Sequence, residues 1–91
     1  MATNPLTAKP VAAFSLGKKR ILVCDVIDIN PHQFLGKEFI FNSLHRQQGR
    51  IKIEGLSTGS QFGENLCDFS YSGAEISPDQ IGADSQIIEM V

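Results

Sequence analysis

The sequence predicts an all-β protein: a small barrel or sandwich of five or six strands, with one or two short helical turns. Short runs rich in β-branched and aromatic residues recur along the 91 residues, and clusters of turn residues separate these runs. No segment has the apolar period of a long helix, and strands do not alternate with helical segments as they would in a parallel sheet. These observations together favour a compact antiparallel fold.

The run from Arg20 to Ile29 gives the strongest strand signal, and we expect it to be the central strand. Ile21 and Val23 alternate with Leu22 and Cys24, so both faces of the strand are apolar. Because a one-sided hairpin leaves one face in water, it cannot bury such a strand. The rest of the chain must therefore wrap around it.

Residues 1–10 are polar or small and contain two prolines, which is typical of a flexible N-terminal arm. A single β-rich domain is then expected over residues 11–91. Residues 11–16 predict its first strand, and Gly17-Lys18 predicts a tight turn into the central strand.

Two segments carry the signals of a single helical turn. In residues 30–36, Asn30 is a capping residue, Pro31 suits the first helical position and Gly36 ends the turn. Residues 77–82 show the same order of capping residue, proline, glutamine and glycine. A terminating glycine usually has a left-handed backbone conformation, which we expect for Gly36.

A second hairpin is predicted from residues 37–45 and 50–54, joined by a four-residue loop that ends at Gly49. In residues 50–54, Ile51 and Ile53 alternate with charged residues, so these isoleucines are expected to face inward. Residues 55–63 read as a loop, residues 65–71 as a strand, residues 72–73 as a turn, and residues 85–91 as a closing strand.

Composition limits the classes of protein that remain. Hydrophobic residues make up 42% and charged residues 20%, and no apolar run is long enough to cross a bilayer. The N-terminus lacks the basic start and apolar block of a secretory signal, so we expect a cytoplasmic or virion protein and no membrane partner. Cys24 and Cys67, each among apolar neighbours, are expected to be buried free thiols, with a disulfide between them as the less favoured alternative.

Charge is unevenly distributed along the chain. Residues 1–52 contain all eight basic residues and three acidic ones, a formal charge of +5, whereas residues 53–91 contain seven acidic residues and none that is basic, a charge of −7. Such asymmetry suggests a charged partner or head-to-tail self-association, unless the fold mixes the two parts on one surface. The expected interaction surface consists of Lys18, Lys19, Arg20, Lys37, Arg46, Arg50 and Lys52.

Residues with catalytic or ligand chemistry do not form a recognisable motif. The spacing of Cys24, His32, His45 and Cys67 fits no zinc motif, so no metal or other cofactor is predicted. Asp25 and Asp28 are three residues apart in a strand and face opposite sides, which prevents them from acting as a paired acid and base. A partly buried Asp25 paired with a lysine or arginine is the expectation. The glycine-containing loop at residues 55–63 lacks the lysine and helix of a phosphate loop.

The sequence therefore favours a non-enzymatic binding or assembly module. Such a module would dock onto a larger protein complex through its charge and its arm, as a small virion component or an inhibitory partner does, and it could self-associate. The alternative is a single-stranded nucleic-acid binder resembling an OB-fold, since basic residues lie near Phe34, Phe39 and Phe41 in the sequence. A pI near 5.5 argues against this alternative. Phe39 and Phe41 are also expected to be in the core and not on the surface. A third reading is a small enzyme whose site forms only in three dimensions.

Overall fold

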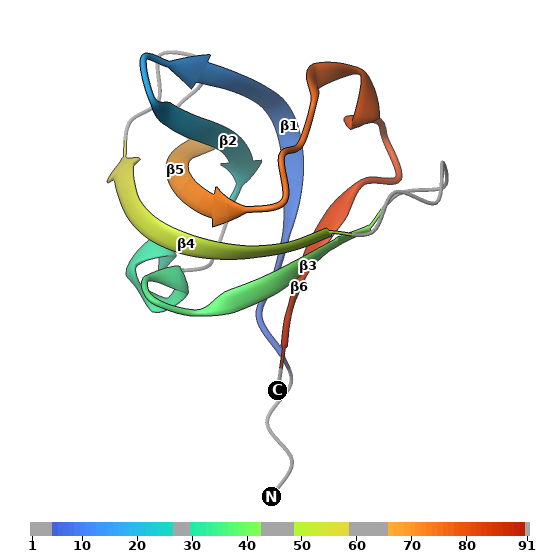
Figure 1. Cartoon of the computed structure of the whole chain (residues 1–91). Helices are drawn as coiled ribbons and strands as arrows, with labels where there is room; N and C mark the ends of the chain where they lie inside the picture. The colour runs from blue at the N-terminus through green and yellow to red at the C-terminus, as the bar shows by residue number, and fades with distance from the viewer. Residues whose placement is uncertain (1–4, 27–29, 43–48, 59–65, 91) are drawn as a thin grey trace, which may run out of the picture.

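The computed structural model describes residues 5–26, 30–42, 49–58 and 66–90. Six strands in these residues form a closed barrel in which every neighbouring pair is antiparallel, so the predicted fold class is confirmed (Figure 1). The order around the barrel is β1-β2-β5-β4-β3-β6. In chain order the elements are β1 (Thr7–Leu16), β2 (Lys19–Asp25), the 3₁₀ turn η1 (Pro31–Phe34), β3 (Glu38–Asn42), β4 (Gly49–Thr58), β5 (Leu66–Gly73), the 3₁₀ turn η2 (Pro78–Gln80) and β6 (Gln86–Glu89).

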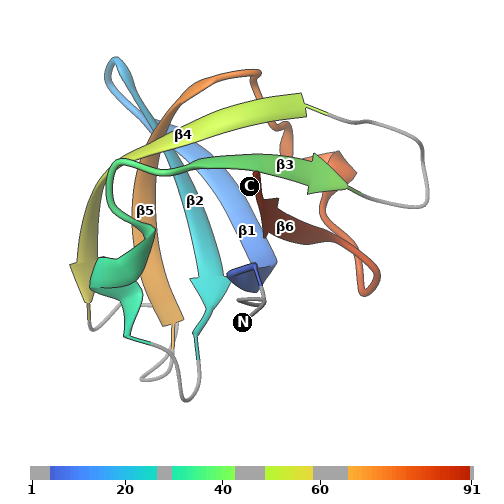
Figure 2. The same ribbon diagram turned by 90° about the horizontal axis from the view of Figure 1, so that it is seen from below.

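The strands follow a Greek-key path. β3, β4 and β5 are successive neighbours, and β5 lies beside β2, the strand that precedes them in the chain. β6 then closes the barrel between β3 and β1, because Ile88 pairs with Ile40 on one side and with Thr7 on the other (Figure 2). Closure gives every one of these six strands a neighbour at both edges, which removes the unpaired edge of an open sheet.

β2 is buried on both faces, as its sequence predicts. Leu22 and Cys24 belong to the core inside the barrel, with no exposed surface. Ile21 and Val23 point to the opposite face and are also buried. β2 ends at Asp25, and residues 27–29 of the expected strand lie outside the described residues.

Aromatic side chains fill the centre of the barrel. Phe34, at the end of η1, stacks on Phe39 of β3, and it also packs against Phe69 of β5; both pairs of ring centroids are 5.1 Å apart. All three side chains are fully buried. The short turn η1 is therefore a core element, although His32 and Gln33 are exposed.

Two bulges interrupt the strand pairing. One lies at Val11 in β1 and the other at Glu54 in β4, where the register shifts by one residue. A bulge bends its strand and increases the local twist, which helps a sheet of this width close on itself. Across the bulge in β1 the buried positions shift from Ala8 and Pro10 to Ala13, and Val11 at the bulge is 40% exposed.

The predicted caps are present at both helical turns. Asn30 Oδ1 accepts a hydrogen bond from the backbone N–H of His32 at 3.0 Å. The backbone N–H of Ser77 donates to Gln80 Oε1 at 2.7 Å, so the Gln80 side chain caps the start of η2. Gly36 has a φ of +76°, which confirms its left-handed conformation.

Several predicted boundaries need correction. β1 begins at Thr7 and not at Val11, because Thr7 and Ala8 pair with β6; of the expected arm, residues 1–4 lie outside the described residues. β4 continues to Thr58, so the loop predicted from Gly55 begins later, and β5 includes the predicted turn at residues 72–73. In each case pairing with a distant strand extends a segment whose local composition favours a loop.

Candidate docking surface

The basic residues of the first hairpin lie at one end of the barrel. Gly17 and Lys18 form the turn between β1 and β2, and Gly17 has a φ of +60°. Lys18 and Lys19 are exposed. Arg20 is half-buried, and its Nη1 atom donates to the backbone carbonyl of Gly73 at 2.6 Å, which ties the hairpin to the end of β5.

The beginning of β4 approaches the same end of β5 from the other side. Lys52 pairs with Ser72, while Arg20 of β2 pairs with Tyr71. The carbonyl of Arg50 accepts a hydrogen bond from Ala74 N at 3.0 Å, just beyond β5. β5 is thus flanked at its C-terminal end by basic residues from both neighbouring strands, which we call the basic cluster: Lys18, Lys19, Arg20, Arg50 and Lys52.

Two members of the expected surface are not in this cluster. Lys37 lies just before β3, and its Nζ atom is 3.3 Å from Glu89 Oε2 of β6. Its charge is therefore already partnered at the closing strand. Arg46 lies outside the described residues.

The fold partly mixes the charges that the sequence separates. Lys37, from the basic part of the sequence, pairs with Glu89 from the acidic part. The strand order β1-β2-β5-β4-β3-β6 also places β5 and β6, which belong to the acidic part, next to strands of the basic part, so the two parts alternate around the barrel. The charge asymmetry of the sequence therefore persists only locally, as the concentration of positive charge in the basic cluster.

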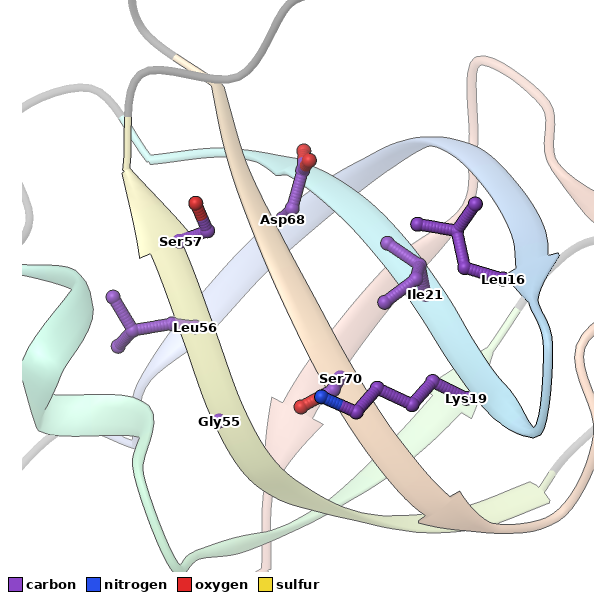
Figure 3. A pocket seen from close by; sticks show the side chains of 8 residues that line it. All are labelled: Leu16, Lys19, Ile21, Gly55, Leu56, Ser57, Asp68 and Ser70. Atoms are coloured by element: carbon purple, nitrogen blue, oxygen red, sulfur yellow. The ribbon is translucent and has the colours of Figure 1, made fainter.

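A depression of about 390 Å³ adjoins the cluster on the outer face of the barrel (Figure 3). Its base contains Gly55, Ser57 and Ser70, whose small side chains leave the strands uncovered. A Cβ atom at Gly55 would lie 2.9 Å from Ser70 Oγ, so the two strands are close at this point. The remaining lining residues are Leu16, Lys19, Ile21, Leu56 and Asp68.

Leu16 and Lys19 connect the depression to the basic cluster. Leu16 is 62% exposed, a high value for a large apolar side chain. In Figure 3 the Lys19 side chain extends from β2 towards Ser70 of β5, and both residues line the depression. Asp68 lies in the same lining, and its Oδ1 atom is buried without a hydrogen-bond partner among the described residues.

Sequence reasoning missed this depression, although a signal for it exists. Along β5, Cys67, Phe69 and Tyr71 alternate with the polar residues Asp68 and Ser70. This alternation predicts an outer face of short polar side chains. The second half of β4, from Gly55 to Thr58, could not be recognised, because Gly55 and Ser57 read locally as a loop.

The residues considered for catalysis or metal binding do not converge. Cys24 and Cys67 are buried free thiols in the core, whereas His32 is exposed on η1 and its Nδ1 atom is 3.2 Å from Asn30 Oδ1. His45 and Asp28 lie outside the described residues. Within the described ranges, no three His, Cys, Asp or Glu side chains lie close enough together to hold a metal ion.

The phenylalanines considered for base stacking are in the core. Phe34, Phe39 and Phe41 have exposed fractions of 0%, 0% and 1%. None of them can offer a ring face to a nucleic-acid base without opening the barrel.

Comparison of the chain with protein-family models, curated proteins and solved structures finds no match. None of the helical segments in the described part of the chain is long and apolar enough to span a bilayer.

Proposed function

We propose that this protein is a non-enzymatic binding module that docks onto an acidic surface of a partner protein in a larger assembly, such as a virion or the target of an inhibitory protein. The observation that carries the proposal is the convergence of basic side chains from β2 and β4 on the end of β5, beside an open depression and the exposed Leu16. A second copy of the chain is the other partner that such a surface could bind, through its acidic residues.

Charge and shape contribute differently to this docking. The basic cluster attracts an acidic surface over a distance set by screening, about 10 Å at 0.1 M salt. Leu16 and the depression supply the apolar contact and the shape that discriminate between partners. We therefore expect salt to weaken the association mainly by slowing its formation.

The alternative function, binding of single-stranded nucleic acid, has less support. A single-strand platform combines basic side chains with exposed aromatic rings. Because Phe34, Phe39 and Phe41 are buried, the basic cluster would have to bind phosphates without stacking.

A comparison of two probes tests the proposal. One is a fluorescent peptide of glutamate residues with a central leucine, and the other is a single-stranded oligonucleotide of equal charge; fluorescence anisotropy at 0.15 M salt measures both. We expect peptide binding, weakened about tenfold or more by Lys19→Gln combined with Lys52→Gln, and no measurable oligonucleotide binding. Lys9→Gln is the matched control, because Lys9 is an exposed strand lysine outside the basic cluster.

Two results would overturn the proposal. Micromolar oligonucleotide binding, with a log–log salt slope near −3, would indicate neutralisation of about four phosphates and favour the nucleic-acid function. Equal peptide affinity of the double variant and the Lys9→Gln control would show that the cluster is not the docking surface. Sedimentation at low and high salt, run in parallel, reports whether a second copy competes for the same face.

A further inference from the structure

The two cysteines lie directly opposite each other on neighbouring strands. Cys24 of β2 pairs with Cys67 of β5 in the strand register, and both side chains belong to the core, with exposed fractions of 0% and 1%. Directly paired residues of antiparallel strands point to the same face of the sheet. The two thiols therefore face each other inside the barrel.

The spacing of such a pair suits a disulfide. Directly opposite residues have Cα atoms about 4.5 or 5.5 Å apart, depending on the type of pair. Disulfide-bonded cysteines have Cα atoms roughly 4.4 to 6.8 Å apart. The Cβ atoms of directly opposite residues are about 4.5 to 5.5 Å apart, against roughly 3.5 to 4.5 Å in a disulfide, so forming the bond draws β2 and β5 slightly together at this point.

We propose that Cys24 and Cys67 form an oxidation site, at which a peroxide converts the pair into an intramolecular disulfide that joins β2 to β5 within the closed barrel. The Cys67 thiolate attacks one peroxide oxygen, which gives a sulfenic acid and, after protonation, one water. The Cys24 sulfur then attacks the sulfenic sulfur, the S–S bond forms, and the second water leaves. The two thiols lose two electrons and two hydrogens in total, and one peroxide is reduced to two waters.

Burial raises the pKa of both thiols. Desolvation raises the pKa of Cys67 to about 11, and the nearby Asp68 charge adds to this effect. The pKa of Cys24 is raised well above its usual value, first by burial and then by Cys67 and Asp25. A hydrogen bond from the backbone of Ser57 acts against this rise in the pKa of Cys67, whereas the contacts of Cys24 only raise its pKa, so we assign Cys67 as the attacking residue and Cys24 as the resolving residue.

The same burial makes the reaction slow at neutral pH and strongly dependent on pH. On its other side, Cys24 pairs with Pro10 of β1, and Cys67 pairs with Thr58 of β4. Neither of these two residues is titratable. The charged groups next to the cysteines along their own strands are Asp25 and Asp68. With a thiolate fraction on the order of 10⁻⁴ at pH 7, the rate should rise about tenfold per pH unit between pH 7 and pH 10. A free cysteine of the unfolded chain would instead level off above a pH of about 8.5.

The test is the intact mass of the folded protein after treatment with hydrogen peroxide, followed by peptide mapping without reductant. We expect a disulfide-linked peptide pair containing Cys24 and Cys67, with a mass two hydrogens lower than that of the two thiol peptides. Mapping is needed because peroxide also oxidises methionine, and the chain contains Met1 and Met90. A sulfenic-acid reagent should label Cys67 in the Cys24→Ala variant and leave Cys24 unlabelled in the Cys67→Ala variant.

The wild-type result stands even if a variant fails to fold. Cross-linking closes a loop of about 40 residues in the unfolded chain, so the oxidised protein should have a Tm at least about 5 °C higher. The proposal is overturned if both thiols remain free under conditions that oxidise the denatured chain, if only intermolecular dimers form, or if the Tm falls. A rate that levels off above pH 8.5 would place the reaction in the unfolded chain and would also overturn it.

Discussion

Glu89 holds the start of β3 to the end of β6, since its Oε2 atom lies 3.3 Å from Lys37 Nζ. Its other oxygen, Oε1, accepts a hydrogen bond from the backbone N–H of Leu6 at 2.9 Å, just before β1. One carboxylate thus contacts segments next to both strands that pair with β6. These contacts lie at the seam where the barrel closes, so the ionisation of Glu89 should affect stability.

The first prediction concerns pH. The Leu6 N–H lowers the pKa of Glu89 below its usual value, and Lys37 adds to this effect against the opposing desolvation. Because the pKa is lower in the folded state, the stabilisation is present above the unfolded pKa of about 4.3 and is lost as pH falls through the folded value. Glu89→Gln should therefore reduce the Tm at pH 7 and flatten its decline in acid.

Thermal unfolding between pH 2 and pH 7 measures this effect. Glu54→Gln is the matched control, because Glu54 is exposed on β4. The pKa of Asp79 is also lowered, chiefly by its hydrogen bond with Ser77, so part of the acid decline should remain in the Glu89→Gln variant. Identical pH profiles for wild type and Glu89→Gln would contradict the assigned role of Glu89.

The second prediction compares two glycines with positive φ angles. Gly36→Ala should cost about 1 kcal/mol, since φ is +76° but a Cβ atom would have no neighbour within 4 Å. Gly73→Ala should cost more, because φ is +104° and the Cβ atom would lie 2.5 Å from the carbonyl oxygen of Arg50. Urea unfolding of both variants gives the difference. Equal midpoints would show that the close approach of β5 to β4 relaxes easily.

The third prediction tests η1 as a core element. Phe34→Ala should destabilise the protein by about 3 to 5 kcal/mol, because it removes a fully buried ring that packs against Phe39 and Phe69. Leu35→Ala, at a position 40% exposed, is the control and should have a much smaller effect. Chemical denaturation measures both. If Phe34→Ala lowered the free energy of unfolding only slightly, the packing of the barrel interior would not depend on this turn.

The fourth prediction separates folding from docking at the basic cluster. Arg50→Glu should change the Tm by less than about 5 °C, which corresponds to roughly 1 kcal/mol in a domain of this size, because the side chain is exposed. Lys52→Glu should lower the Tm further, since it places a carboxylate opposite Glu38. Circular dichroism melting tests both variants. If Arg50→Glu unfolded the barrel, the basic cluster would be needed for folding, and its role could not be assigned to docking alone.

The fold could be predicted from the sequence to a large extent, and the site only in part. Local patterns identified β2, the β3–β4 pairing, both capped turns and the left-handed Gly36, because these depend on residues close together in the chain. The basic residues of the first hairpin were also recognised. The second half of β4 and the depression beside it were not recognised, since no local signal distinguishes Gly55 and Ser57 from loop residues.

The sequence by itself determined that the chain is all-β, that β2 is covered on both faces, and that glycines and prolines end the strands and turns. Those features follow from side-chain period and from the backbone preferences of single residues, as at Pro31 and Gly36 around η1, whereas Pro10 and Gly55 lie inside strands. Only the tertiary structure decided that Lys37 pairs with Glu89, that Cys24 faces Cys67, and that Lys52 and Arg20 flank the same end of β5. These relationships depend on strand order and register, which are set by closure of the whole barrel around a shared core and therefore by residues far apart in the chain.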